Sequence, residues 1–295
     1  MVQRTEDQRL KDQRIIDLYD AFTHGGISRR TFLDRLTAIA GSSAAALALL
    51  PLLQNDYARA ATVAPNDARL AIEKVTYPAP GTTITGYLAR LKDKAKRPAV
   101  VVIHENRGLN PHIEDIARRL ALAGFLALAV DMLSPLGGTP IDEDKARDMI
   151  GTLNANQTAE RIAAAVPYLA AHAESNGKVG AVGFCWGGGM ANRLAVLAPA
   201  ALKAAVAYYG AQPPADQVKS IHAALLLHYA GLDTRMNAGI DAYKAALTAD
   251  HKTFTIYVYP GANHAFNNDT SSRHDKEAAT LAWGRTVAFL HEYLG

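Results

Sequence analysis

A tight glycine turn within residues 179–189 constrains the fold more than any other feature of the sequence. The apolar residues before the turn are typical of a strand, and residues 190–197 after it are compatible with a helix. Gly183 and Gly187 stand two residues before and two residues after Cys185, the single cysteine of the 295-residue chain. Bulk at these glycines would obstruct a strand and a helix that nearly touch. The spacing therefore predicts a sharp strand-to-helix turn with Cys185 at its apex.

The position of Cys185 favours a reactive thiol. A helix N-terminus stabilises the thiolate, which is the nucleophilic form of cysteine. A lone cysteine can instead be inert and buried, and a glycine-rich strand-to-helix turn can bind phosphate. The Gly-x-Gly-x-x-Gly and Gly-x-x-x-x-Gly-Lys-Ser/Thr patterns that accompany phosphate binding do not occur in the sequence. We therefore interpret Cys185 as a nucleophile.

A nucleophilic thiol needs a base and a group that orients the base. Asp233 follows the apolar run 223–229, and His264 follows the β-rich segment 253–259. The chain order nucleophile, acid, histidine is typical of hydrolytic enzymes whose nucleophile lies on a sharp strand-to-helix turn, called a nucleophile elbow. We predict that Asp233 orients His264 and that His264 transfers protons for Cys185. Asp233 could also cap a helix that begins near residue 235.

Nine other histidines occur in the sequence. Three of them, His172, His274 and His291, fall in polar helical stretches and are expected to be solvated. His264 differs from all nine because it follows the last predicted strand and comes after both the thiol and the acid. The other six are His24, His104, His112, His222, His228 and His251.

Three motifs together resemble the dienelactone hydrolase family: Gly-Phe-Cys-Trp-Gly-Gly, Gly-x-Asp and Pro-Gly-x-x-His-x-Phe. The resemblance runs from about Leu70 to Leu294. It implies an α/β-hydrolase fold, a cysteine nucleophile and cleavage of an ester or lactone. By the same resemblance Glu105 would hold the resting thiol by a hydrogen bond and help to form the thiolate. Glu105 could instead be a strand-end carboxylate paired with Arg107.

Two departures from the family affect substrate recognition. Dienelactone hydrolases bind the carboxylate of their substrate with two arginines, and this chain has Pro135 and Asn268 at the matching places. Arg273 is close enough in sequence to replace one of them. The resemblance therefore implies the family's hydrolytic chemistry without its dienelactone specificity. Backbone N–H groups of Trp186 and Asn106 would stabilise the oxyanion.

The first sixty residues resemble an export signal. Ser28-Arg29-Arg30-Thr31-Phe32-Leu33 precedes an apolar run at 36–53, and Ala58-Arg59-Ala60 is a small-residue cleavage pattern. The twin arginine predicts export by the Tat machinery and a periplasmic or secreted protein. Residues 1–60 would then contribute nothing to the hydrolase core, which would belong to a domain at 61–295. The alternative is a membrane anchor, since eighteen residues lie near the lower limit of a span.

The remaining segments alternate between strand and helix patterns. Continuous apolar runs such as 99–103 are typical of a parallel sheet covered on both faces by helices. We therefore predict the α/β class, with the site outside the carboxyl ends of the strands. We expect strands at 72–77, 83–89, 98–104, 125–131, 178–184, 203–209, 222–229 and 253–259, and helices at 112–123, 157–173, 186–198, 235–248 and 274–293.

Composition excludes several function classes. The net charge is +3 and no block of Lys and Arg occurs, so nucleic acid is not an expected partner. A single cysteine cannot form an internal disulfide. His104 and His112 lack a His-Glu-x-x-His arrangement, and His264 and His274 are too far apart for one helical face. We expect no cofactor and no metal.

Other functions stay open at this point. The same three residues could cleave an acyl thioester or an amide, and the domain could be a noncatalytic binding module or a thiol redox sensor. A complete set of Cys185, Asp233 and His264 favours catalysis, and a sensor usually has a second, resolving cysteine. Residues 133–139 are expected to form a loop that faces the substrate. The sequence indicates neither the substrate nor the oligomeric state.

Overall fold

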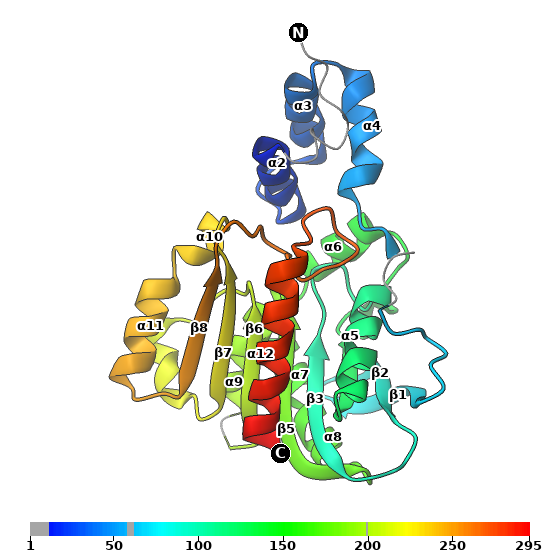
Figure 1. Cartoon of the computed structure of the whole chain (residues 1–295), viewed down its shortest axis with the longest axis vertical. Coiled ribbons are helices and arrows are strands. Elements are labelled where there is room, and N and C mark those ends of the chain that lie inside the picture. Colours follow the sequence, from blue (N-terminus) through cyan, green and yellow to red (C-terminus); the bar gives the residue numbers. More distant parts are fainter. Residues whose placement is uncertain (1–11, 58–61, 199) are drawn as a thin grey trace.

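The central sheet has eight strands in the order β1-β2-β4-β3-β5-β6-β7-β8. The computed structural model describes residues 12–57, 62–198 and 200–295 (Figure 1). β1 and β2 form a hairpin and β2 pairs antiparallel with β4, whereas the pairs from β4 through β8 are all parallel. The predicted mostly parallel α/β-hydrolase sheet is therefore confirmed. The strands are β1 (Leu70–Ala79), β2 (Thr82–Leu91), β3 (Arg97–Ile103), β4 (Leu126–Asp131), β5 (Ser175–Phe184), β6 (Leu202–Tyr208), β7 (Ala224–Ala230) and β8 (Phe254–Tyr259).

Helices cover both faces of this sheet and produce two hydrophobic cores. Successive side chains of a strand point to opposite faces, so Val100 and Val102 belong to one core and Val101 to the other. The first core is closed by α5 (Pro111–Leu122) and α12 (Lys276–Leu294). The second is closed by α7 (Ala155–Ala163), α8 (Ala165–Ala170), α9 (Trp186–Leu197) and α11 (Ile240–Ala249).

The helix predictions need three corrections. The single helix expected at 157–173 is divided at Ala164 into α7 and α8, because Pro167 has no N–H to donate and is tolerated only in the first turn of a helix. The helix expected at 235–248 is divided into α10 (Thr234–Asn237) and α11. Helix α6 (Glu143–Gly151) was not predicted, although Asp142 caps it by accepting from two backbone N–H groups.

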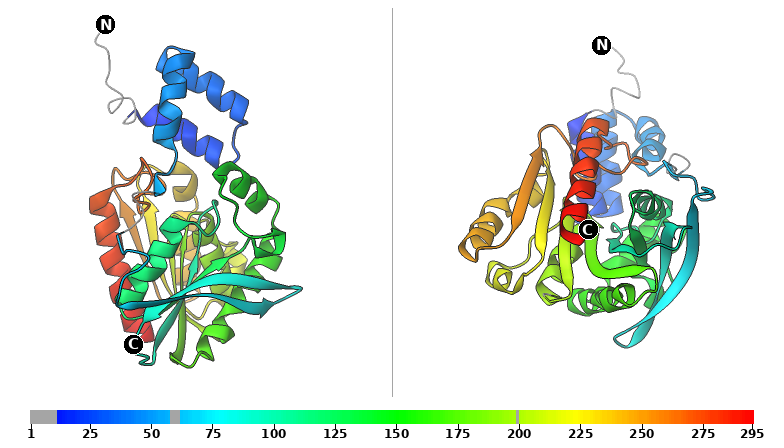
Figure 2. Two further views of the ribbon diagram at one scale, coloured as in Figure 1. Left: turned by 90° about the vertical axis from the view of Figure 1, so that its right-hand side faces the viewer. Right: turned by 60° about the horizontal axis from the view of Figure 1, so that its bottom comes forward.

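Residues 12–57 form a compact helical unit, which we call the N-terminal cap. It contains α2 (Gln13–Thr23), α3 (Arg29–Ala40) and α4 (Ser43–Leu53). These helices share a core of their own, in which the rings of Phe22 and Phe32 stack at a centroid distance of 4.7 Å. The cap lies beyond the carboxyl ends of the parallel strands, where the site is expected (Figures 1 and 2).

Residues 12–57 have a core of their own, separate from the two cores of the sheet, and they also contact the hydrolase domain. Arg29 donates to Asp144 of α6 at 2.8 Å, and the guanidinium of Arg147 lies 4.7 Å from the ring centre of Phe22. Tyr57 donates a hydrogen bond to Glu143. The cap is therefore attached to the domain by polar contacts around α6. The expected cleavage pattern Ala58-Arg59-Ala60 and the expected domain start at Ala61 lie outside the described residues.

The apolar run expected at 36–53 is divided by a bend. Gly41 ends α3 in the left-handed conformation, with φ of 85°, and Ser42 then caps α4. No single helix in the described ranges is long and apolar enough to cross a bilayer, but α3 and α4 together pass that test with a bend of 113° between them.

Candidate active site

The strand-to-helix turn is built as its glycines predict. Cys185 lies between β5 and α9 with φ of 54° and ψ of −117°, a backbone conformation that residues other than glycine rarely adopt. A Cβ atom on Gly183 would lie 2.0 Å from the carbonyl oxygen of Gly187. A Cβ atom on Gly187 would lie 2.4 Å from the carbonyl oxygen of Ile103, at the end of β3. The absence of both side chains therefore allows α9 to begin directly against β5 and β3.

The predicted acid and base are in direct contact. Nδ1 of His264 lies 2.5 Å from Oδ2 of Asp233, and both side chains are buried. Burial by itself would raise the pKa of Asp233, but the hydrogen bond and charge of His264 outweigh it and hold that pKa below its ordinary value. Oδ1 of Asp233 accepts from the backbone N–H of Met236 at 3.1 Å and so caps α10. Asp233 therefore orients His264 and caps a helix at the same time.

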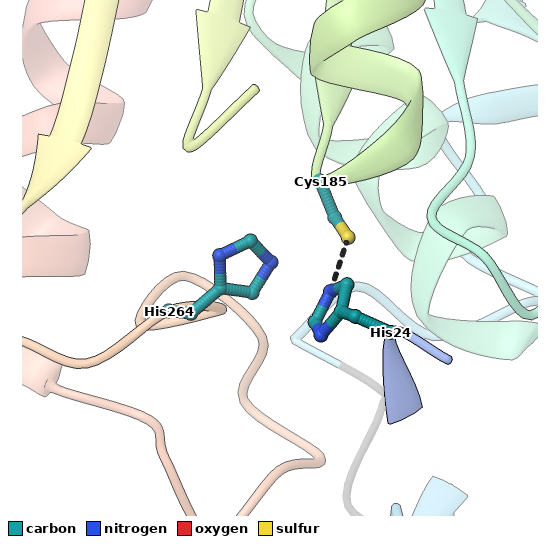
Figure 3. Close-up of side chains that lie close together, drawn as sticks. All are labelled: His24, Cys185 and His264. Atoms are coloured by element: carbon teal, nitrogen blue, oxygen red, sulfur yellow. Dashed lines mark hydrogen bonds between the residues drawn. The ribbon is translucent and has the colours of Figure 1, made fainter. Parts of the chain in front are cut away.

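The thiol and the base lie close without a direct hydrogen bond. A ring nitrogen of His264, the Sγ atom of Cys185 and a ring nitrogen of His24 all lie within 4.8 Å of one another. Nε2 of His264 is buried and has no hydrogen-bond partner among the described residues. In Figure 3 this ring presents one nitrogen toward Cys185 and His24. The free nitrogen of the Asp233–His264 pair is therefore available to the thiol.

His24 is a site residue that the sequence did not single out. Its Nε2 lies 3.3 Å from Sγ of Cys185 (Figure 3), and its Nδ1 lies 2.8 Å from the carbonyl oxygen of Asp20. Burial would lower the pKa of His24, but the charge of Cys185 and the hydrogen bonds that His24 makes with Asp20 and Cys185 outweigh burial and raise this pKa. No local motif marks His24, because it is 161 residues from Cys185 and belongs to the segment interpreted as a signal.

Glu105 has neither of the two partners expected for it among the described residues. Its Oε2 accepts from Nδ2 of Asn268 at 2.7 Å, and its Oε1 accepts from the hydroxyl of Tyr209 at 3.4 Å. Arg107 instead donates to Asp144 at 3.2 Å. Asn268, which stands where an arginine was expected, therefore holds Glu105 in place. Glu105 and Cys185 still line the same small cavity, so the carboxylate remains beside the thiol.

Trp186 and Asn106, the two residues expected to stabilise the oxyanion, lie after the neighbouring strands β5 and β3. Trp186 is the first residue of α9, so its N–H has no acceptor within the helix. Asn106 follows β3, whose end packs against the start of α9 at Gly187.

His104 contacts the two chain turns that contain Trp186 and Asn106, a role that the sequence did not indicate. Its ring stacks on Trp186 at 5.2 Å. Nδ1 lies 2.6 Å from the carbonyl oxygen of Glu105, and Nε2 accepts from the N–H of Met132 at 3.2 Å. Nε2 must therefore be unprotonated and Nδ1 must donate. Burial lowers the pKa of His104 and favours this neutral form.

Comparison with known proteins agrees with this geometry. The family model "Dienelactone hydrolase family" matches residues 84–294. The chain belongs to the dienelactone hydrolase family. By membership it is a hydrolase of the ester- and lactone-cleaving class. A second family model, "YqhI-like", matches residues 6–41, which include the whole of α2 and α3.

Relatives and solved structures agree with the family assignment. The chain is 51% identical over 107 residues to an Escherichia coli K12 hydrolase fragment named YghX. The aligned residues are 35% of this chain and 92% of that protein. It is 31% identical to a Saccharolobus solfataricus protein named as a carboxymethylenebutenolidase, over 74% of this chain and 97% of that protein. A crystal structure named as a dienelactone hydrolase of Klebsiella pneumoniae superposes with a TM-score of 0.69 at 28% identity, over 76% of this chain and 99% of that one.

In this family member the thiol faces a cavity of about 810 Å³. Its apolar wall comes from the residues Ile150, Leu153, Trp186, Met190, Pro213 and Met236. Arg147 at its rim is paired with Asp144 at 2.9 Å, and Arg193 donates to Asn156 at 2.7 Å. Arg273, the residue that could replace a missing arginine, donates to Asp20 of the cap at 2.8 Å. Arg235, which also lines the cavity, lies 3.6 Å from a carboxylate oxygen of Asp20, so each of these four guanidinium groups already has a partner within the protein.

Proposed function

We propose that this chain hydrolyses an ester or lactone through a covalent thioester on Cys185, with His264 as the proton carrier and Asp233 as its orienting partner. One observation carries the proposal: the hydrogen-bonded Asp233–His264 pair leaves Nε2 of His264 buried and unpaired within reach of a thiol at a strained strand-to-helix turn. A polar nitrogen in that position costs free energy unless it gains a partner.

The first half of the reaction forms the thioester. Sγ of Cys185 turns from His24 toward His264 and gives its proton to Nε2 as it attacks the carbonyl carbon. The backbone N–H groups of Trp186 and Asn106 donate hydrogen bonds that stabilise the negative charge developing on the oxygen. The tetrahedral intermediate then collapses, the C–O bond of the ester breaks, and His264 protonates the departing alcohol oxygen. In a lactone this alcohol remains part of the same molecule.

The second half regenerates the thiol. A water molecule gives a proton to His264 and attacks the thioester carbon, after which the C–S bond breaks and Cys185 recovers its proton. The products are a carboxylic acid and an alcohol. The ring nitrogen lies within 4.8 Å of Sγ in the free protein and has to approach to about 3 Å, a tightening that is common when substrate binds.

The cavity favours an uncharged substrate with an apolar body. Its wall is largely hydrophobic, and Arg147, Arg193 and Arg273 are already bound to other residues. A substrate carboxylate would have to displace Asp20 from Arg273 or one of the other partners. We therefore propose neutral esters or lactones of moderate size as the substrate class.

Cys185→Ala and His264→Ala test the chemistry, and His222→Gln serves as a control because that histidine is exposed. We expect both site variants to fold and to lose about 10⁴-fold or more in kcat, while the control keeps its rate. The panel should pair each neutral ester and lactone with an analogue that has an added carboxylate, and should include a thioester and an anilide of the same acyl group. Unchanged hydrolysis by Cys185→Ala would remove the thiol from the mechanism. Preference for the carboxylated analogues would overturn the substrate class.

We also propose Tat-dependent export to the periplasm or to the exterior, which rests on the twin arginine and the apolar run that follows it. Arg29 and Arg30 begin α3, and both are exposed. Replacing both by Lys should retain the full-length protein in the cytoplasm, measured by cell fractionation against the unaltered chain. Equal export of the two proteins would refute the Tat route, and recovery of uncut protein in membranes would favour an anchor.

A further inference from the structure

His24 is the one imidazole at the thiol that the proposed hydrolysis does not need. The triad already contains a base, yet the cap places a second ring beside Sγ. The ring centroids of His24 and His264 are 4.6 Å apart at an interplanar angle of 81°. One thiol and two imidazoles thus converge from the cap, from the strand-to-helix turn and from the loop after β8 (Figure 3).

We propose that His24, Cys185 and His264 form a binding site for Zn²⁺, and that occupation of this site reversibly blocks the nucleophile. The proposal rests on the proposed function only in assigning Cys185 as that nucleophile. Thiolate sulfur and imidazole nitrogen are preferred ligands of Zn²⁺, which takes three protein ligands and one open position in accessible sites. The open position would face the cavity that begins at Cys185.

The separations suit this ion. Tetrahedral Zn²⁺ with Zn–S near 2.3 Å and Zn–N near 2.1 Å places its ligand atoms roughly 3.5 Å apart. Nε2 of His24 is already 3.3 Å from Sγ, and the third ligand atom lies within 4.8 Å of both. The remaining adjustment is about 1 Å at His264, a smaller shift than a different side-chain rotamer would produce.

Hydrogen bonds behind each ring orient it as in a metal site. Metal-bound histidines usually donate their second ring N–H to a carboxylate or a backbone carbonyl. Nδ1 of His264 faces Asp233 at 2.5 Å, and Nδ1 of His24 faces the carbonyl oxygen of Asp20 at 2.8 Å. In both rings Nε2 is therefore the nitrogen left for an ion. Nε2 of His264 in particular is buried, with 4% of the side chain exposed, and has no partner in the described chain.

Binding balances without any redox step. Zn²⁺ loses bound water, the Cys185 thiol releases its proton to solvent, and the resulting thiolate forms the Zn–S bond. Both imidazoles bind as neutral rings. Because the thiolate is then coordinated, it cannot attack a carbonyl or an alkylating reagent, and removal of the ion by a chelator restores it.

The single cysteine makes the test specific to this site. Full-length protein is first treated with a chelator and then titrated with Zn²⁺ alone by calorimetry, with Co²⁺ as a spectroscopic substitute. We expect one ion per chain, a near-ultraviolet thiolate-to-Co²⁺ charge-transfer band, and slower alkylation of Cys185 by iodoacetamide. Absence of one-to-one binding or of the charge-transfer band would overturn the proposal.

Variants decide whether the cap supplies a ligand. His24→Gln should weaken Zn²⁺ binding by at least about tenfold, and Asp233→Asn should weaken it about 10- to 100-fold by loss of the hydrogen bond behind His264. His222→Gln should leave the affinity unchanged. Circular dichroism checks that each variant is folded, and if His24→Gln is not, His24→Ala provides the cap variant. Unchanged affinity in the folded cap variant would remove His24 from the site.

These measurements also separate the two proposals. Ion binding and alkylation do not require turnover, so Zn²⁺ binding without any ester hydrolysis would support the metal site and contradict the hydrolase mechanism. Hydrolysis that depends on Cys185, in a protein that does not bind Zn²⁺, would support the hydrolase mechanism and contradict the metal site.

Discussion

Among the glycines, Gly183 is the one where an added Cβ atom would make the shortest contact, so Gly183→Ala should distort the strand-to-helix turn at Cys185. The new Cβ atom would lie 2.0 Å from the carbonyl oxygen, 2.4 Å from the carbonyl carbon of Gly187 and 2.9 Å from the amide nitrogen of Gly188. All three are backbone atoms, so no side chain can rotate away. Ordinary contact needs roughly 3.4 Å, so the start of α9 would have to move by more than 1 Å.

This displacement has two measurable consequences. Overpacking of this kind costs about 1–3 kcal/mol of unfolding free energy. A misplacement of about 1 Å between nucleophile, base and oxyanion donors costs on the order of 100-fold in rate. We therefore expect Gly183→Ala to lose about 100-fold or more in kcat on a neutral ester, and to unfold at a lower urea concentration.

Gly284→Ala is the matched control. Gly284 lies within α12 and is exposed, and a Cβ atom there would meet nothing within 4 Å. Helix propensity alone should raise stability by about 0.5–1 kcal/mol, with no change in kcat. If Gly183→Ala retained wild-type activity and stability, β5 and α9 could not approach as closely as described, and the geometric basis of the turn would be refuted.

Three further predictions concern the residues around the site. Asp233→Asn should keep the cap of α10 but lose about 10³- to 10⁴-fold in kcat, because the amide cannot orient and stabilise the protonated ring of His264; a loss below tenfold would assign Asp233 to capping alone. Glu105→Gln should change both turnover and the pH dependence of Cys185 alkylation, and if neither changes, Glu105 is structural. Burial lowers the pKa of His228 to about 3, so its contribution to stability is complete above about pH 6.5 and is lost as the pH falls toward 3, by up to about 1.4 kcal/mol per pH unit. Urea titrations of His228→Gln across this range should show a flatter dependence, and an identical slope in the two proteins would contradict it.

Local spacing explains why part of the site was predictable from sequence. The turn around Cys185 follows from two glycines within five residues, and the placement of Asp233 and His264 follows from their position directly after apolar strands. Parallel strands bring such positions to one edge whatever the length of chain between them. The family resemblance placed Glu105 beside the thiol, but it could not identify Asn268 and Tyr209 as the hydrogen-bond partners of Glu105.

The N-terminal cap was not predictable in this way. Its twin arginine and apolar run satisfy an export pattern, and the same residues also pack into three helices with their own core. Nothing in the spacing of residues 12–57 indicates which surface the cap covers. The contact of His24 with Cys185 depends on docking between segments 161 residues apart, and local patterns contain no information about such docking.

The docking of the cap has a consequence for chain cleavage. Tyr57 hydrogen-bonds to Asn110 at 3.0 Å, and the N–H of Val63 donates to Asp115 at 2.8 Å, so the chain is fixed to the domain on both sides of the expected cut after about Ala60. While the chain is intact, the tether supplies an effective concentration of the cap in the millimolar range. After a cut, a cap that binds with a Kd of about 1 mM would occupy roughly 0.1% of a domain present at 1 µM. One hydrolysed peptide bond would thus convert a covalently attached neighbour of Cys185 into a ligand that dilution removes.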